Sequence, residues 1–261
     1  MVIDWLQTLS TVECLVFFLT ANAAVLAVSV SLWHVVRLCA PGSMELDPAP
    51  PVSVSDLLMT ASSIGMCTVV SAVGAWLTSH HWLKLSPTTI VRLVVDCALI
   101  ILIMDLFMYV SHRAAHWQPI YRWIHEPHHE HVHTNSVSLF VLHPLEVFGF
   151  AAMLISVTAI VRPCEGAIFA FLTINLAAGT IGHAGLSGRS NPEAGSLQTV
   201  TEFSAFHSGH HLDETCNFGF YTSIWDRVLG TAKQEPVVRS GMTVAAYLHA
   251  WVGCRQPGMR R

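Results

Sequence analysis

Histidines are the residues of this sequence whose type and spacing could carry chemistry. The chain contains 16 of them, and 12 fall between His112 and His211. An isolated histidine is most often a satisfied core or surface residue, but that explanation does not extend to 12 in spaced clusters. Neutral imidazole is the commonest metal ligand among side chains. The clusters therefore predict a metal site.

The first cluster, HRAAH, places two imidazoles on one helix face because His112 and His116 are four residues apart. The same face, followed backward, carries Tyr109 and Asp105. A carboxylate inside an apolar segment is expensive and usually functional. We expect Asp105 to orient a ligand histidine through the second ring nitrogen. The alternative is that Asp105 pairs with a neighbouring helix.

The second and third clusters, HEPHH and HSGHH, share a spacing that again gathers side chains on one helix face. Their histidines are His125, His128, His129, His207, His210 and His211. Pro127 fits the first turn of a helix, so a helix is predicted to begin there, with His125 at its start. His131 and His133 follow too closely to share that face. We expect them beside the ligands or facing solvent, and a ligand role for either stays open.

Two lone histidines lie at the ends of apolar segments on the side of the clusters. His183 is predicted to be a ligand, and His143, which precedes Pro144, is a further candidate. The three clusters alone supply eight imidazoles. One metal ion takes at most about six ligands and structural zinc takes four, so eight convergent imidazoles imply two metal ions. Imidazole suits Zn, Cu, Fe and Ni alike.

Apolar segments must position these clusters. The runs cover 14–36, 57–78, 90–111, 137–161 and 165–182, and about 20 apolar residues suffice to cross a bilayer. The chain is 52% hydrophobic and 11% charged, against about 25% charged in soluble domains. Its mean hydropathy is +0.52. The sequence predicts an all-α, polytopic membrane bundle of four to five spans, capped by a histidine-rich metal-binding region.

The distribution of basic residues predicts which side of the membrane carries the histidines. The last two runs are separated by a few residues, so they form a hairpin whose ends lie on one side. With the histidine clusters in the cytoplasm, ten Lys and Arg residues fall inside, and Lys84, Arg92 and Arg162 fall outside. This agrees with the positive-inside rule. We expect a cytoplasmic metal site and an extracytoplasmic N-terminus.

Other classes of protein find little support in the sequence. A net charge of −4 gives no electrostatic case for nucleic acid binding. Seven cysteines without a CxxC pair indicate neither a disulfide framework nor a zinc ribbon. The N-terminal region lacks a basic segment and a small-residue cleavage site, so we expect the first apolar run to be retained as a span.

The motifs, taken in order, resemble those of the fatty acid hydroxylase/sterol desaturase superfamily. They stand as HRAAH, HEPHH, His183 in IGHAG, and HSGHH, followed by NFGFYTSIWDRVLGT. The family has an aromatic segment with a WD pair and a GT at this place, and an acidic and an aromatic residue before its first box. The matching residues, expected to support the ligands, are Asn217, Tyr221, Trp225, Asp226, Asp105 and Tyr109. HP at His143 and CNF after the last box resemble the sterol-oxidising branch.

The resemblance implies an oxygenase domain with two iron ions over residues 95–233, preceded by membrane spans in 1–94 and followed by a cytoplasmic tail, 234–261. It implies O2 as co-substrate and hydroxylation or desaturation of a lipid-like substrate, such as a fatty acyl chain or a sterol. The chain contains no GxGxxG, flavin motif or haem-binding domain. We therefore expect a separate electron donor, a reductase or small carrier, on the cytoplasmic face.

Two other functions remain open on the same residues. A zinc hydrolase would use a carboxylate to activate water, and Glu126, Glu130 and Asp213 are available for that role. A metal transporter would carry ligands near mid-span on broken helices. The transporter is disfavoured because the predicted ligands gather at one membrane face.

Overall fold

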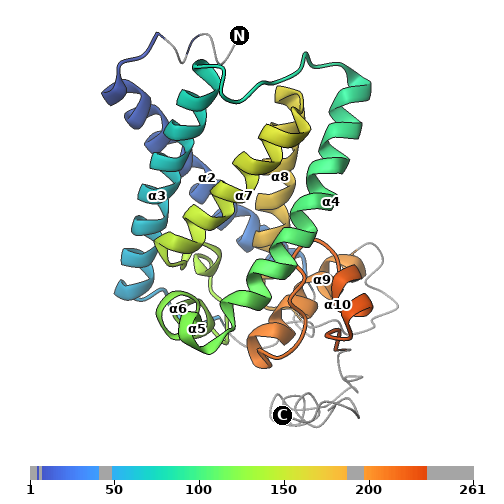
Figure 1. The fold of residues 1–261 in the computed structure, drawn as a ribbon. Coiled ribbons are helices and arrows are strands. Elements are labelled where there is room, and N and C mark those ends of the chain that lie inside the picture. Colours follow the sequence, from blue (N-terminus) through green and yellow to red (C-terminus); the bar gives the residue numbers. More distant parts are fainter. Residues whose placement is uncertain (1–4, 6–7, 41–48, 187–196, 234–261) are drawn as a thin grey trace, which may run out of the picture.

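In the computed structural model, five long helices lie side by side, and the shorter helices gather at one end (Figure 1). The structure describes Trp5 and residues 8–40, 49–186 and 197–233. The long helices are α2 (Thr11–Cys39), α3 (Val54–Ser79), α4 (Ile90–Ala115), α7 (Pro144–Val161) and α8 (Glu165–Gly182). Each is long and apolar enough to cross a membrane. The predicted all-α membrane bundle is thus confirmed, while the predicted tail, 234–261, lies outside the described residues.

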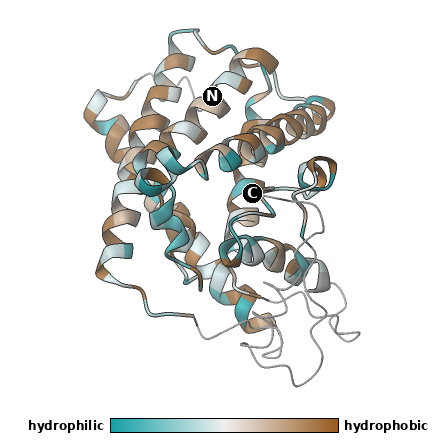
Figure 2. Ribbon diagram, turned by 60° about the horizontal axis from the view of Figure 1, so that its bottom comes forward, coloured by the Kyte–Doolittle hydropathy of each residue, from teal (hydrophilic) through white to brown (hydrophobic). Residues whose placement is uncertain are grey.

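The short helices carry five of the nine histidines predicted to be ligands. They are α5 (Gln118–Ile124), α6 (Glu126–His129), α9 (Leu197–Leu212) and α10 (Ile224–Leu229), with a 3-10 turn, η2 (Ser138–Phe140). Seen from this end, hydrophobic residues run along the long helices, and hydrophilic ones gather where the short segments meet (Figure 2). The apolar exterior of the long helices suits lipid, and the polar cluster is enclosed at one end.

Side-chain caps define where the first spans begin. Ser10 and Glu13 form a capping box at the start of α2, and Ser53 and Asp56 form another at the start of α3. In each box the two side chains satisfy backbone N–H groups that have no partner within the helix. These caps set the N-terminal ends of α2 and α3, which carry none of the clustered histidines.

Helix α7 begins seven residues later than the predicted run at 137. Pro144 occupies the first turn, and His143 caps the helix by accepting a hydrogen bond from the Leu145 N–H. Proline favours this position because it has no N–H to leave unpaired. The apolar residues before it form η2 and an extended segment instead. Near the end of this segment, the Val141 carbonyl pairs with His128 Nδ1.

At the end away from the histidines, the turn between α7 and α8 is tied to the loop before α4. The Ser86 N–H donates to the Pro163 carbonyl over 2.9 Å, and the Ser86 hydroxyl donates to the Arg162 carbonyl over 2.8 Å. Asp96 accepts from the Cys164 N–H, which begins α8. These bonds place both loops on one side of the bundle, opposite the histidine-bearing segments.

The core between α4, α7 and α8 consists of buried apolar side chains. Ile100, Met104, Val157, Ala167 and Phe171 pack together with Cys164. Burial of a large apolar side chain stabilises a fold by about 1.5–3 kcal/mol in water, but lipid reduces that drive. Close packing therefore holds these three helices together. The same helices carry His112 near the end of α4 and His183 directly after α8.

Candidate metal centre

Nine of the predicted ligand histidines converge in two adjacent groups. The first group contains His112, His116, His125, His129 and His210, and the second contains His128, His183, His207 and His211. Within each group, one ring nitrogen per residue lies within 4.8 Å of all the others. The rings of the two groups touch, with centroids of His129 and His211 4.7 Å apart.

Each group draws its histidines from several elements. The five-histidine group combines the last turn of α4 with α6 and α9, and the four-histidine group combines α6, the end of α8 and α9. The second and third clusters each contribute histidines to both groups. In HEPHH, His125 and His129 belong to the five-histidine group and His128 to the four-histidine group. In HSGHH, His210 belongs to the five-histidine group, and His207 and His211 belong to the four-histidine group. As predicted, Pro127 lies in the first turn of α6, and His125 precedes that helix.

Five of the nine rings are oriented through their Nδ1 atoms. His112 pairs with the Phe218 carbonyl at 2.9 Å, and His210 pairs with the Cys216 carbonyl at 2.6 Å. His128 pairs with the Val141 carbonyl at 3.2 Å, and His183 with the Gly179 carbonyl at 2.8 Å. His125 pairs with the Glu146 carboxylate at 2.5 Å. Because an unprotonated oxygen only accepts, each Nδ1 carries the hydrogen, and each Nε2 of a neutral ring offers a lone pair.

The Nε2 atoms of His128 and His183 lie 3.3 Å apart. Both rings donate through Nδ1 to carbonyls, so neither neutral ring has a hydrogen to place between these nitrogens. Two facing lone pairs repel unless a cation lies between them. A metal ion bound by both nitrogens would remove this repulsion. The pair is therefore evidence for a metal site, and this evidence is independent of the number of histidines in the sequence.

The spacing of the Nε2 atoms fits metal coordination. His125 and His129 are 3.1 Å apart, as are His116 and His210, and His207 lies 3.2 Å from both His183 and His211. Nitrogens held about 2.0–2.1 Å from one metal ion would be separated by roughly 2.8–3.4 Å for angles between octahedral and tetrahedral. The separations fall in this range, so the donor set fits metal ions.

Burial favours the neutral form of six of these imidazoles. It lowers the pKa of His116 to about 3 and the pKa of His183 to about 4. Burial and repulsion from the neighbouring imidazoles also hold the pKa of His128, His207, His210 and His211 well below the ordinary value. Neutral imidazole is the form that binds metal, so the low pKa values of these histidines favour metal binding over protonation.

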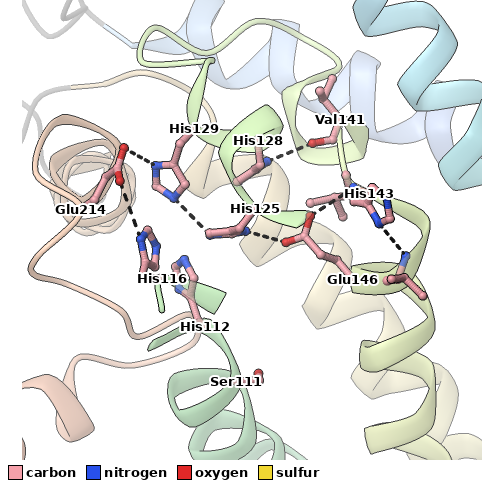
Figure 3. A network of polar contacts seen from close by, with 12 residues as sticks. Ser111, His112, His116, His125, His128, His129, Val141, His143, Glu146 and Glu214 are labelled. Carbon is pink, nitrogen blue, oxygen red and sulfur yellow. Dashed lines mark hydrogen bonds and ion pairs between the residues drawn. The ribbon is translucent and has the colours of Figure 1, made fainter. Parts of the chain in front are cut away.

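Sequence reasoning missed Glu146, which orients His125 (Figure 3). One carboxylate oxygen accepts from His125 Nδ1, and the other accepts from the His143 backbone N–H at 3.1 Å. The signal was available, since Glu146 occupies the third position of a helix that starts at His143 and Pro144. The capping box of α7 thus extends to a predicted ligand.

Glu214 was also missed, and it faces two histidines of the first group (Figure 3). Its carboxylate lies 3.8 Å from His116 Nδ1 and 3.9 Å from His129 Nδ1. The Tyr121 hydroxyl donates to it over 2.6 Å. The distances from Glu214 to His116 and His129 are too long for direct hydrogen bonds. Glu214 therefore supplies negative charge beside the group while Tyr121 fixes its position.

Asp105 has a different role from the one predicted. It accepts hydrogen bonds from the Tyr221 and Thr222 backbone N–H groups and from the Thr222 hydroxyl. The Phe218 carbonyl, rather than Asp105, orients His112. The alternative partner, a neighbouring helix, is also not what the structure shows, because Asp105 binds a loop. The carboxylate is 2% exposed, so it anchors this loop from inside the bundle.

The loop anchored by Asp105 supplies carbonyls to two histidines, and Asp226 holds it from the other side. Asp226 accepts from the Phe218 and Gly219 N–H groups and from the Thr231 hydroxyl, and it is fully buried. The Tyr109 hydroxyl pairs with the same Thr231 hydroxyl at 3.0 Å. This network fixes the carbonyl that accepts from His112.

The remaining predicted supporting residues belong to the same segment. Asn217 adopts a left-handed backbone conformation (φ 56°) and accepts from the Lys233 N–H. The Tyr221 hydroxyl donates to Asn175 on α8 over 2.6 Å. The indole N–H of Trp225 has no hydrogen-bond partner within the part of the chain that the structure describes. Within the described residues, none of these three side chains forms a hydrogen bond with a histidine of either group.

The structure places the other candidate histidines outside both groups. His143 caps α7 through its Nδ1 atom. His131 Nε2 lies 3.1 Å from the Asp56 carboxylate, and its Nδ1 lies 2.8 Å from the Ser138 hydroxyl. His133 is exposed.

Known proteins resemble the chain over the region that builds this site. It is 26% identical over 157 residues to a Delta(7)-sterol 5(6)-desaturase of Candida glabrata, covering 59% of this chain and 39% of the relative. It is 28% identical over 155 residues to the lathosterol oxidase of Homo sapiens, covering 59% and 50%. A third relative is methylsterol monooxygenase 1 of Danio rerio, 28% identical over 144 residues, covering 54% and 48%. The chain thus spans half or less of the length of these relatives.

No solved structure matches the chain. The model of the fatty acid hydroxylase family matches residues 97–231, which is just over half of the sequence and includes all nine converging histidines. The chain is therefore an integral membrane protein with a histidine-lined candidate metal centre, and it belongs to the fatty acid hydroxylase family.

Proposed function

We propose that this protein is a membrane-bound oxidoreductase that uses O2 and external electrons to hydroxylate or desaturate a C–H bond of a lipid-like substrate. The observation that carries the proposal is the pair of facing Nε2 atoms of His128 and His183. The pair favours a cation, and the nine-histidine donor set supports two ions. The relatives named as a desaturase, an oxidase and a monooxygenase support oxidation as the chemistry.

The five-histidine and four-histidine groups would each hold one iron ion. Iron bound there would supply the activation of O2 and the oxidation of the C–H bond. The chain's own residues orient the imidazoles, chiefly through the Phe218, Cys216, Val141 and Gly179 carbonyls and through Glu146. Fixed orientation matters because metal ligands must keep their geometry throughout turnover.

The enclosed position of the groups supports the exclusion of water from the reaction. His210 is 0% exposed, and His129, His183 and His211 are at most 3% exposed. Water exclusion limits side reactions of activated oxygen species. The groups also adjoin the ends of α4, α7 and α8, which are lipid-compatible helices. A hydrophobic substrate could then keep its body in the bilayer while the target carbon reaches the metals.

A sterol or a fatty acyl chain is the proposed class of substrate. The three relatives described above carry names of sterol enzymes, which favours a sterol-like molecule. The shared region is the one that builds the metal site, so the relatives support the chemistry more directly than the substrate.

The metal centre is proposed to face the cytoplasm, where a separate electron donor would supply two electrons for each O2 used. The sidedness rests on the ten basic residues expected on the histidine side against three on the other. Two of these three residues, Arg92 and Arg162, lie together near the α7–α8 turn, where the Arg92 guanidinium donates to the Arg162 carbonyl. Residues 95–233 are proposed as the oxygenase domain, and 1–94 as a preceding membrane unit.

A zinc hydrolase on the same histidines would need a carboxylate placed to activate water. Asp213, one of the carboxylates available for this role, is bound to Lys233 at 2.8 Å and to the Thr215 hydroxyl at 2.5 Å. Glu126 and Glu130 are exposed. The two carboxylates that do lie beside the groups, Glu146 and Glu214, face Nδ1 atoms rather than the Nε2 atoms that would bind metal. These placements favour the oxidoreductase.

Lipid profiling tests the proposed reaction. Cells with and without the gene are compared by mass spectrometry, with a His183→Ala strain as the inactive control. A lipid that gains one oxygen atom or loses two hydrogen atoms only in the presence of the intact chain supports the proposal. A product that differs by hydrolysis, with no oxidised lipid, would contradict it.

A further inference from the structure

The last turn of α8 is held by side chains from outside that helix. The Trp33 indole N–H, from α2, donates to the His183 carbonyl over 2.9 Å. The Thr134 hydroxyl, from the loop after α6, donates to the same carbonyl over 2.9 Å. Arg37 donates to the Ala184 carbonyl over 2.9 Å. The last carbonyls of a helix have no partner within it, so these donors satisfy groups that would otherwise be costly to bury.

One face of α2 makes these contacts. Ser29, Trp33 and Arg37 are four residues apart, so they lie along a single stripe of the helix. Ser29 is 1% exposed and its hydroxyl pairs with Thr180 at 2.7 Å, one turn before His183. The Arg37 guanidinium lies 4.9 Å above the Trp33 ring, which holds the indole in place.

Trp33 is buried, at 6% exposed, although most of α2 faces outward. A span that served only as a membrane anchor would not need to bury an indole with its N–H directed at the end of another helix. Tryptophan in a membrane protein is usually enriched at the water interface. Its buried position here is therefore explained by the carbonyl that it binds.

The backbone held in this way carries the His183 imidazole. Its Nδ1 donates to the Gly179 carbonyl of the same helix, and its Nε2 lies 3.3 Å from His128 Nε2 and 3.2 Å from His207 Nε2. Because the ring is bonded to its own helix, a shift of the helix end moves Nε2 with it. Metal–ligand distances are fixed to within about 0.2 Å. Small shifts at this helix end therefore change the four-histidine group.

We infer that Trp33 is a positioning residue for His183, so that α2 forms part of the four-histidine metal site. The inference rests on the proposed function, since it concerns the metal that this group would hold. Helix α2 lies outside residues 97–231, which the family model covers. The five-histidine group is oriented by Phe218, Cys216 and Glu146 and does not depend on Trp33.

Cobalt binding to the metal-free full-length protein tests the inference. Trp33→Phe keeps an aromatic ring but removes the N–H donor. We expect the wild type to bind two Co²⁺ ions, and Trp33→Phe to bind one of them unchanged and the other about 10–100-fold more weakly. The visible absorption bands of the weakened cobalt should change, and those of the other should not. Trp76→Phe, on the exposed face of α3, is the matched control and should bind as the wild type does.

A second variant separates positioning from general destabilisation. Thr134→Val removes the other donor to the same carbonyl, and we expect it to weaken the same single Co²⁺ ion. The double variant should lose more than the two single losses combined, because it leaves the carbonyl unpaired. Wild-type cobalt affinities at both sites in Trp33→Phe would overturn the inference while leaving the proposed function intact. Equal weakening of both ions would also overturn it. A wild type that binds no Co²⁺ would remove the proposed metal centre and the inference together.

Discussion

The Nε2 atoms of His128 and His183 face each other at a distance of 3.3 Å, and each ring donates a hydrogen bond from its Nδ1 atom to a backbone carbonyl. The two residues come from different elements, the short helix α6 and the end of the span α8. Fifty-five residues of chain separate them. The geometry therefore results from the fold rather than from a local motif, and it favours a cation between the rings.

Removal of one ligand from the four-histidine group should release one metal ion. We expect His183→Ala to hold one metal ion per chain where the wild type holds two, and to lose lipid oxidation. The remaining three imidazoles lack the fourth donor that completes their group. Elemental analysis of the purified proteins measures the content. His133→Ala, in an exposed position outside both groups, is the control and should keep both ions.

Loss of the carboxylate beside His125 should weaken the five-histidine group. Glu146→Gln keeps the shape of the side chain but leaves one oxygen to serve both His125 Nδ1 and the His143 N–H. We expect metal affinity at this group to fall by about 10–100-fold, because partners of ligand histidines commonly contribute that much. Competition with a chelator measures the affinity.

The matched control for Glu146 is Glu13. It closes the capping box of α2 in the same way but has no histidine partner in that box. Glu13→Gln should lose the capping contact and keep full metal affinity. Similar affinity losses in both variants would show that capping, rather than orientation of His125, explains the effect.

The positions of the spans and the convergence of the nine histidines could be predicted from the sequence because both leave a periodic pattern. Long apolar runs have few alternatives in a membrane, and the HRAAH and HxxHH spacings place histidines about one helical turn apart. The role of Asp105 could not be predicted, since it depends on Tyr221 and Thr222, more than 100 residues away. Glu146 had a local signal in its capping box. Trp33 had none, because its partner is a backbone carbonyl of a distant helix.

Asp226 should contribute strongly to stability through the loop that it holds. Its carboxylate accepts three hydrogen bonds and is fully buried. Asp226→Asn presents an amide hydrogen where an acceptor is needed, which costs about 1–3 kcal/mol for each group left unpaired. We expect a lower unfolding temperature and weaker metal binding, since the Phe218 carbonyl orients His112.

Asp213→Asn provides the comparison for Asp226. Its carboxylate accepts from Lys233 and from the Thr215 N–H and hydroxyl, and its side chain is 25% exposed. Because water reaches this carboxylate but not that of Asp226, we expect Asp213→Asn to lose less stability than Asp226→Asn. The account of the loop would be wrong if Asp226→Asn were no less stable than Asp213→Asn.

Metal removal should lower the unfolding temperature of the protein without removing its helices. An ion that binds only the folded state stabilises it by about 2.7 kcal/mol at 100 times its dissociation constant. A chain of this size shifts by roughly 2–4 °C for each kcal/mol. Treatment with a chelator in detergent should therefore lower the transition by several degrees, and added Fe²⁺ should restore it. Far-ultraviolet circular dichroism should show the five spans retained.

The loops at the two ends of the bundle should lie on opposite sides of the membrane. In intact cells, an impermeant thiol reagent should label His81→Cys, near the α3–α4 turn, beyond the wild-type background. His133→Cys, on the histidine side, should be labelled only after the membrane is permeabilised. The reverse pattern would place the metal centre outside the cytoplasm.

The iron content of the wild-type protein tests the central proposal most directly. The protein is purified from iron-replete cells, and iron and zinc per chain are measured together with O2 consumption in the presence of substrate and an electron donor. We predict two iron ions per chain and O2 consumption that depends on them. Two zinc ions, no iron and no O2 consumption would contradict the proposal that the nine histidines build an oxygenase.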